Sequence, residues 1–214
     1  MKEQYRGYTI KIEEDANPMN PREEWDNIGT MVCSHGRYTL GDKDHGYDFS
    51  DYDGWSEVKQ AILRDCPDAI ILPIYMYDHG GITINTSGFS CQWDSGQVGF
   101  IFLSLYEARK EYSWKKITKK RRAQLESYLQ GEVETYDHFL TGNVHGYEVI
   151  APNGEEIDSC SGFFGDNEES GLMEEARSQV DWAIKEIRKA HFEKLKAWIK
   201  NKVEVTYRKP CGAL

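Results

Sequence analysis

The sequence lacks any long apolar run. The longest, Ala69 to Met76, is far shorter than the roughly 20 residues that a helix needs to cross a bilayer. The first ten residues, MKEQYRGYTI, contain no apolar signal-peptide core. Both absences argue against membrane insertion and against export. We therefore expect a protein that works in the cytoplasm without contact with a membrane.

Cysteine is scarce and scattered, with five residues at positions 33, 66, 91, 160 and 211 and no Cys-x-x-Cys pair. This pattern argues against a disulfide framework and against a thiolate zinc site. We expect reduced thiols, most of them buried.

Phosphate-loop and calcium-loop signatures are also missing. No Gly-Lys-Ser/Thr follows the glycines between residues 80 and 99. The loop 41–54 holds five aspartates, at positions 42, 44, 48, 51 and 53, but their spacing does not match a twelve-residue calcium loop that ends in glutamate. Cys33 and His35 supply two ligands where zinc needs three or four. The sequence therefore predicts neither a metal site nor a cofactor.

Length and composition predict one folded domain, residues 1–214. The chain is 39% hydrophobic and 13% aromatic, which is too rich in core-forming residues for disorder. Alternating or continuous apolar runs predict strands at 8–12, 28–34, 69–77, 82–86, 98–103, 147–151 and 156–160. Helical spacing predicts helices at 55–65, 104–112, 118–141 and 170–201. We expect an α+β fold, in which a largely antiparallel sheet with a central meander is packed by about four helices, including a long C-terminal helix.

Charge is strongly segregated within the net charge of −10. Residues 125–184 contain 14 acids and 1 base, whereas residues 107–124 contain 2 acids and 8 bases and residues 185–214 contain 3 and 9. One interpretation is that these are solvated faces that partly neutralise one another. The other is that a coherent acidic surface repels nucleic acid and attracts a basic groove. The basic run KKITKKRR is expected to pair with carboxylates of the chain or of a partner protein, so we expect no direct binding of nucleic acid.

The segment YMYDHGGITINTSGFSCQWDSGQVGFIFLS, residues 75–104, holds the best candidates for catalysis. Asp78, His79, Cys91 and Asp94 would suit a cysteine hydrolase or a nucleotide-handling enzyme. However, His79 precedes the strand 82–86 and Cys91 follows it, which predicts a separation of roughly 20 Å at about 3.3 Å per residue. We therefore expect no assembled catalytic site. Glu132 and Glu134 lie two apart on a helix and face different directions, so they do not form an acid-base pair.

Three segments of the chain resemble an uncharacterised family of proteins carried by phages, plasmids and other mobile elements. They are the Trp-Asp-Asn-x-Gly-Thr-Met element in EEWDNIGTMVCSHGRYTLGD, the run LPIYMYDHGGITINTSGFSCQWDSGQVGF, and GEVETYDHFLTGNVHGYEV. The resemblance covers most of residues 20–165. It implies no activity or catalytic residues, only a context: a non-structural accessory protein that acts inside a prokaryotic host.

These observations favour an accessory protein that acts by protein binding and inhibits a nucleic-acid-handling host defence system through its acidic surface. The partner would be a host protein or a protein–nucleic-acid complex. The residues expected to bind it are Trp93, Glu155, Glu156, Asp166, Glu168 and Glu169. An enzyme centred on residues 75–104 is the alternative. A homo-oligomer built on the long C-terminal helix is a third hypothesis.

Overall fold

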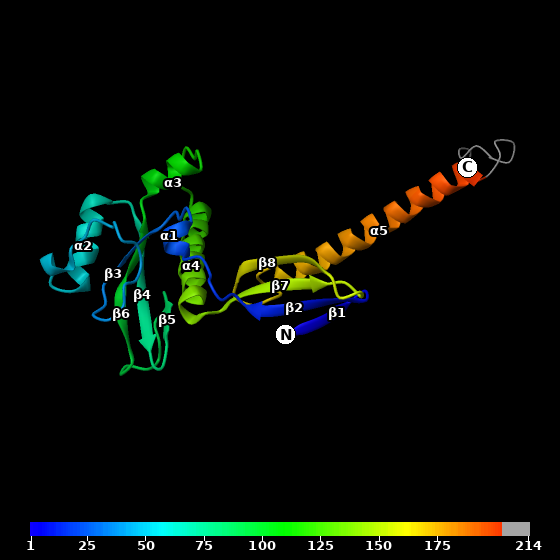
Figure 1. Ribbon diagram of the computed structural model, residues 1–214. Coiled ribbons are helices and arrows are strands. Elements are labelled where there is room, and N and C mark those ends of the chain that lie inside the picture. The colour runs from blue at the N-terminus through cyan, green and yellow to red at the C-terminus, as the bar shows by residue number, and fades with distance from the viewer. Residues whose placement is uncertain (203–214) are drawn as a thin grey trace. The chain divides into compact units, whose positions relative to one another are not determined.

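The structure, a computed structural model, describes residues 1–202 (Figure 1); Cys211 lies outside the described residues. The chain divides into two compact units. The central unit contains residues 14–144 and 164–166. The terminal unit contains residues 1–13, 145–163 and 167–202. The α+β class, the antiparallel sheets and the long C-terminal helix are confirmed, and the strands are divided between two four-stranded sheets.

The central unit is built on a sheet with the strand order β3-β6-β4-β5. Its strands are β3 (Thr30–Cys33), β4 (Ile70–Asp78), β5 (Ile82–Asn85) and β6 (Ser95–Leu103). Strand β4 lies in the middle of the three consecutive strands, because β6 returns to pair with β4 and not with β5. The register of β4 against β6 shifts between Ile74 and Tyr75, just after Pro73. Proline has no N–H to donate, which makes a bulge next to it favourable.

Helices α2 (Trp55–Asp65) and α4 (Lys119–Thr141) lie on opposite faces of this sheet (Figure 1). The unit also contains the short helices α1 (Pro21–Glu24) and α3 (Leu105–Glu111) and a 3₁₀ turn at Phe49–Asp51. On one face, Leu125 and Leu129 of α4 pack against Ile101 of β6; on the other, Ile62 of α2 packs with Phe100. Helix α4 begins after Thr118, whose hydroxyl accepts the N–H of Arg121, and ends at Gly142 in the left-handed conformation.

The terminal unit contains the second sheet, with the strand order β1-β2-β7-β8. Its strands are β1 (Lys2–Tyr5), β2 (Tyr8–Glu14), β7 (Val144–Ile150) and β8 (Glu156–Phe164). Strand β1 was not predicted, because Lys-Glu-Gln-Tyr is polar. It forms a hairpin with β2 through Arg6 and Gly7, both at positive φ, a geometry that suits a two-residue turn.

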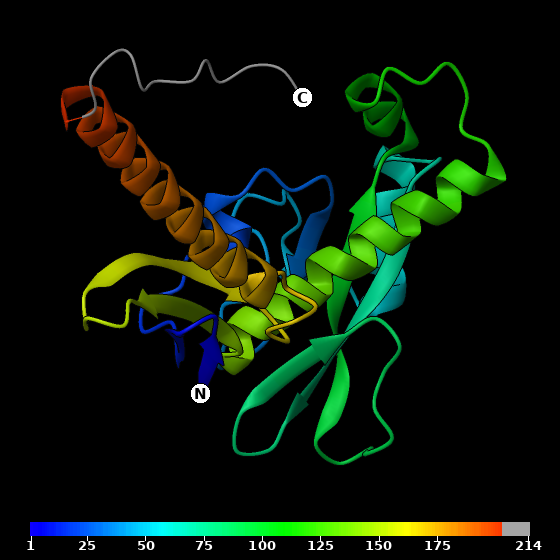
Figure 2. The ribbon, with the colours of Figure 1, turned by 90° about the vertical axis from the view of Figure 1, so that its right-hand side faces the viewer.

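Helix α5 (Leu172–Lys202) belongs to the terminal unit (Figure 2). Its first turns bury Leu172, Met173, Ala176 and Val180 against the sheet. Its later apolar residues, Ile187, Phe192, Leu195, Trp198 and Ile199, are exposed. Among residues 1–202, no helix combines the length and the apolar character required of a membrane span.

The described cysteines are free thiols, but the expectation that most are buried is wrong. Only Cys33 is buried, whereas Cys66 and Cys91 are partly buried and Cys160 is exposed. Burial raises the pKa of Cys33 to about 12. Its thiol is therefore unreactive at neutral pH.

Candidate functional site

The candidate catalytic residues lie at one end of the central sheet, where β4 ends and β6 begins. Tyr77 pairs with Ser95 in the register of these strands. The N–H of Asp78 donates to the carbonyl oxygen of Asp94 at 2.8 Å. Asp78, His79 and Asp94 therefore come together from two neighbouring strands.

Asp94 brings His79 and Cys91 to the same point. The Nδ1 atom of His79 lies 3.4 Å from Oδ2 of Asp94, and the Cys91 thiol donates to that same oxygen at 3.6 Å. The predicted separation of roughly 20 Å is therefore wrong. It assumed that Cys91 stays at the far end of β5, but because β6 pairs with β4, the segment 86–94 returns to the end where β4 stops.

The arrangement differs from that of an activated cysteine nucleophile. Such a site needs a thiol in contact with an imidazole, and the imidazole oriented in turn by a third group. Here the Cys91 thiol donates to Asp94, and the His79 side chain is 71% exposed. In this arrangement the Asp94 carboxylate lies between a thiol and an imidazole. This carboxylate can accept hydrogen bonds from a ligand at the sheet end.

Two further features surround this carboxylate. Asp78 forms an ion pair with Arg37 and accepts a long hydrogen bond of 3.5 Å from the hydroxyl of Tyr38. Trp93 is 96% exposed. Beside them, residues including Tyr75 and Phe89 line a hollow of about 580 Å³. The sheet end is therefore polar, aromatic and open to solvent.

Two aspartates of loop 41–54, Asp42 and Asp48, have structural roles. Asp48 caps the 3₁₀ turn, and hydrogen bonds from the N–H and hydroxyl of Ser50 lower the pKa of Asp48. Asp42 binds Arg22. Within residues 1–202, no three His, Cys, Asp or Glu side chains converge in a way that could hold a metal ion.

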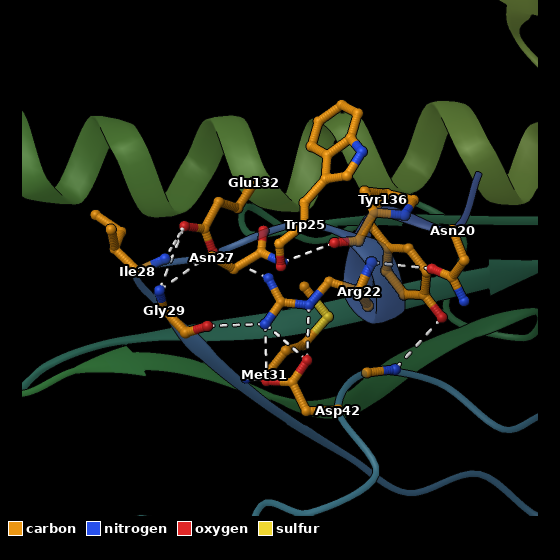
Figure 3. Close-up of polar contacts among 12 residues, drawn as sticks. Asn20, Arg22, Trp25, Asn27, Ile28, Gly29, Met31, Asp42, Glu132 and Tyr136 are labelled. Carbon is orange, nitrogen blue, oxygen red and sulfur yellow. Dashed lines mark hydrogen bonds and ion pairs between the residues drawn. The ribbon is translucent and has the colours of Figure 1, made fainter. Parts of the chain in front are cut away.

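Arg22 is the centre of a buried ionic network that the sequence did not reveal (Figure 3). Its side chain is 1% exposed. The guanidinium donates to both carboxylate oxygens of Asp42, at 2.8 and 2.7 Å, to Glu132 at 2.9 Å and to the carbonyl of Gly29 at 2.8 Å. Such bidentate, charge-assisted hydrogen bonds are strong and specific in geometry.

Both carboxylates of this network also accept backbone hydrogen bonds. Glu132 accepts the N–H groups of Ile28, at 2.8 Å, and Gly29, at 3.3 Å. Asp42 accepts the N–H of Met31 at 2.8 Å. The network therefore ties α4, the segment before β3 and the loop after β3 to one another.

Arg22 remains charged in this setting. Burial disfavours the charged guanidinium, but the hydrogen bonds and charges of Asp42 and Glu132 outweigh burial and raise the pKa of Arg22. Its hydrogen bonds to Asp42, Glu132 and Gly29 offset the cost of burying this charge.

The Trp-Asp-Asn-x-Gly-Thr-Met element wraps this network. The Asn27 amide donates to the carbonyls of Pro21, at 2.7 Å, and Trp25, at 3.0 Å. A Cβ at Gly29 would lie 2.4 Å from the side chain of Leu129 and 2.9 Å from that of Ile101, so a larger residue there requires these buried side chains to shift. Asn27 and Gly29 thus have structural roles. The side chains of Trp25 and Asp26 take no part in the network.

The basic run at the start of α4 pairs partly within the chain. Arg122 lies 3.3 Å from Glu126 in an ion pair. The Arg121 guanidinium lies over the ring of Trp114, 4.5 Å from its centroid.

The predicted acidic binding residues are divided between the two units. Glu155 and Glu156 are exposed, the latter as the first residue of β8 in the terminal unit. Glu168, also in the terminal unit, forms an ion pair with Arg177 at 3.0 Å, and Glu169 is exposed in the turn that precedes α5. Asp166 belongs to the central unit, as does Trp93.

Comparison with profiles of known protein families, with curated proteins and with solved structures gave no match. The function of the chain therefore has to be inferred from its own residues.

Proposed function

We propose that the protein acts by binding another protein through the hairpin of β7 and β8 in the terminal unit. The observation that supports this proposal is the exposed edge position of β8. It is an edge strand of nine residues, most of them exposed. The hairpin segment 145–163 contains four acidic residues, Glu148, Glu155, Glu156 and Asp158, and neither lysine nor arginine.

An exposed edge strand is suited to binding a polypeptide. Its outer edge carries backbone N–H and C=O groups that no neighbouring strand satisfies. A segment of a partner can add to such an edge by backbone hydrogen bonds. The carboxylates of the hairpin then favour a basic partner, both in the rate of encounter and in the choice of partner.

The partner proposed here is a host complex that handles nucleic acid and has a basic groove. The net charge of −10 favours contact with such a groove and opposes contact with nucleic acid itself. The resemblance to mobile-element proteins supplies the context, in which a small acidic protein inhibits a host defence system.

Charge reversal in the hairpin tests this proposal. We expect Glu155→Lys combined with Glu156→Lys to raise the concentration needed for half-inhibition of the target nuclease by about tenfold or more, because like charges facing each other in an interface cost several kcal/mol. The measurement is DNA cleavage by a panel of purified host defence nucleases at fixed ionic strength, with and without the protein.

A matched control keeps the overall charge change the same. Asp44→Lys combined with Asp51→Lys alters two exposed loop residues of the central unit. This control should inhibit like the unchanged protein. Full inhibition by the hairpin variant would refute the acidic-hairpin proposal.

The shared contact at Asp94 supports one second candidate, an enzyme centred on residues 75–104. Under the binding proposal, Cys91→Ala and His79→Ala should each leave inhibition unchanged within about twofold, because surface substitutions away from an interface have small effects. The same nuclease assay measures this. Loss of function in both variants, with folding intact by circular dichroism, would favour the enzyme instead.

A further inference from the structure

A groove in the central unit lies beside the Trp-Asp-Asn-x-Gly-Thr-Met element. It consists of two adjoining hollows of about 570 and 370 Å³ that share Asn27, Ile28 and Tyr112 in their walls. One wall is the segment between α1 and β3, and the other is formed by α3, α4 and the residues between them. The two hollows therefore form one continuous groove with a wall on each side.

The smaller hollow is aromatic. Trp25, Tyr112 and Tyr128 line it. The rings of Tyr112 and Tyr128 lie 6.3 Å apart between centroids, and Trp25 packs edge-on against Phe164 at 5.0 Å, although it remains exposed. Aromatic faces of this kind attract ammonium and guanidinium groups.

The larger hollow is mainly acidic. Asp26, Glu107 and Glu111 line it together with one cation, Lys110. In the part of the chain that the structure describes, none of these three carboxylates forms an ion pair. By contrast, Glu132 forms an ion pair with Arg22. The charge of this hollow thus favours a cationic occupant.

Gly131 supplies an independent observation. It lies in the interior of α4 and lines the aromatic hollow. Glycine in a helix interior is destabilising relative to alanine, and at Gly29 and Gly99 close packing explains its presence. At Gly131, however, an added Cβ would meet nothing within 4 Å. Packing within the chain does not require this glycine, and its effect is to keep the floor of the hollow open.

We infer that this groove binds an arginine or lysine side chain presented by an extended basic segment of a partner protein. The cationic head lies against the aromatic rings, and the flanking backbone follows the acidic hollow. Trp25 and Asp26 thereby gain a role that the Arg22 network does not give them. The site lies in the central unit and includes no residue of the hairpin segment 145–163 of the terminal unit.

The probe is a capped eight-residue peptide with two arginines, and its control replaces both arginines with citrulline, which keeps the shape and removes the charge. Isothermal titration calorimetry on the full chain should show at least tenfold tighter binding of the arginine peptide. Equal binding of the two peptides would overturn the proposal. The proposal would also be overturned if capped arginine amide, a single residue, bound as tightly as the arginine peptide, because a small cation would then be the occupant.

Two variants locate the binding. Gly131→Leu fills the aromatic hollow with a good helix former and should weaken binding about tenfold or more without loss of thermal stability. Glu107→Gln combined with Glu111→Gln should weaken it several-fold, whereas the charge-matched control Asp44→Asn with Asp51→Asn should not. Wild-type affinity in Gly131→Leu would overturn the proposal. So would self-association of the unchanged chain that Gly131→Leu abolishes, because a second copy would then be the occupant.

Discussion

Replacing Arg22 with alanine is expected to destabilise the central unit by about 3–5 kcal/mol, because it leaves two largely buried carboxylates, whose side chains are only 23% and 15% exposed, without their partner. Asp42 and Glu132 would lose a guanidinium that donates to both at 2.9 Å or less. A typical domain has only about 5–15 kcal/mol of stability in total. The variant should therefore unfold at much lower urea concentration, as followed by circular dichroism.

Two comparisons separate this network from an ordinary ion pair. Arg37→Ala removes an ion pair with Asp78 in which the arginine side chain is 69% exposed, and such surface pairs contribute about 0–1 kcal/mol. Arg22→Lys keeps the charge but loses the planar fork that binds Asp42 through two nitrogens, so its cost should be intermediate. Similar costs for Arg22→Ala and Arg37→Ala would contradict the role assigned to the network.

The contribution of Arg22 should not depend on pH in the neutral range. Its folded-state pKa is raised above the ordinary value of a guanidinium. A raised pKa means that the stabilisation is fully present below the unfolded-state pKa and is lost only as the pH rises through the folded-state value. That region is strongly alkaline, so the cost of Arg22→Ala should be the same at pH 6 and pH 8.

Local signals predicted most of the secondary structure. Helix α4 matches the helix predicted at 118–141, and β7 and β8 lie where strands were predicted at 147–151 and 156–160. The polar strand β1 gave no such signal. The division of the strands into two sheets could not be predicted either, because it depends on contacts between residues far apart in the chain.

The candidate site shows the same limit. Its residue types were visible in the sequence, but the meeting of His79 and Cys91 at Asp94 depends on β6 pairing with β4. The partners of Arg22 lie 20 and 110 residues away. Separations of this length along the chain belong to no helical or strand periodicity, so a sequence pattern could not reveal these pairs. Ion pairs of this kind become visible only once the fold has placed α4 against the start of β3.

The second large effect is expected from Gly99→Ala, which adds a single methyl group to β6. Gly99 faces Cys33 in the register of β3 and β6. A Cβ at this position would lie 2.2 Å from the carbonyl oxygen of Val32 and 2.8 Å from the Cys33 sulfur. The first of these atoms belongs to the backbone, so β3 itself has to move. We expect Gly99→Ala to cost about 3 kcal/mol, at the upper end of overpacking effects, measured by urea unfolding.

Gly96 in the same strand provides a matched control. It pairs with Met76, and a Cβ there would meet nothing within 4 Å. Gly96→Ala should therefore be neutral or stabilising by up to about 1 kcal/mol, since alanine loses less conformational freedom on folding than glycine. Equal effects of the two substitutions would show that β3 does not approach β6 as closely as the structure has it. A large effect at Gly99 alone would instead confirm the close pairing of β3 with β6.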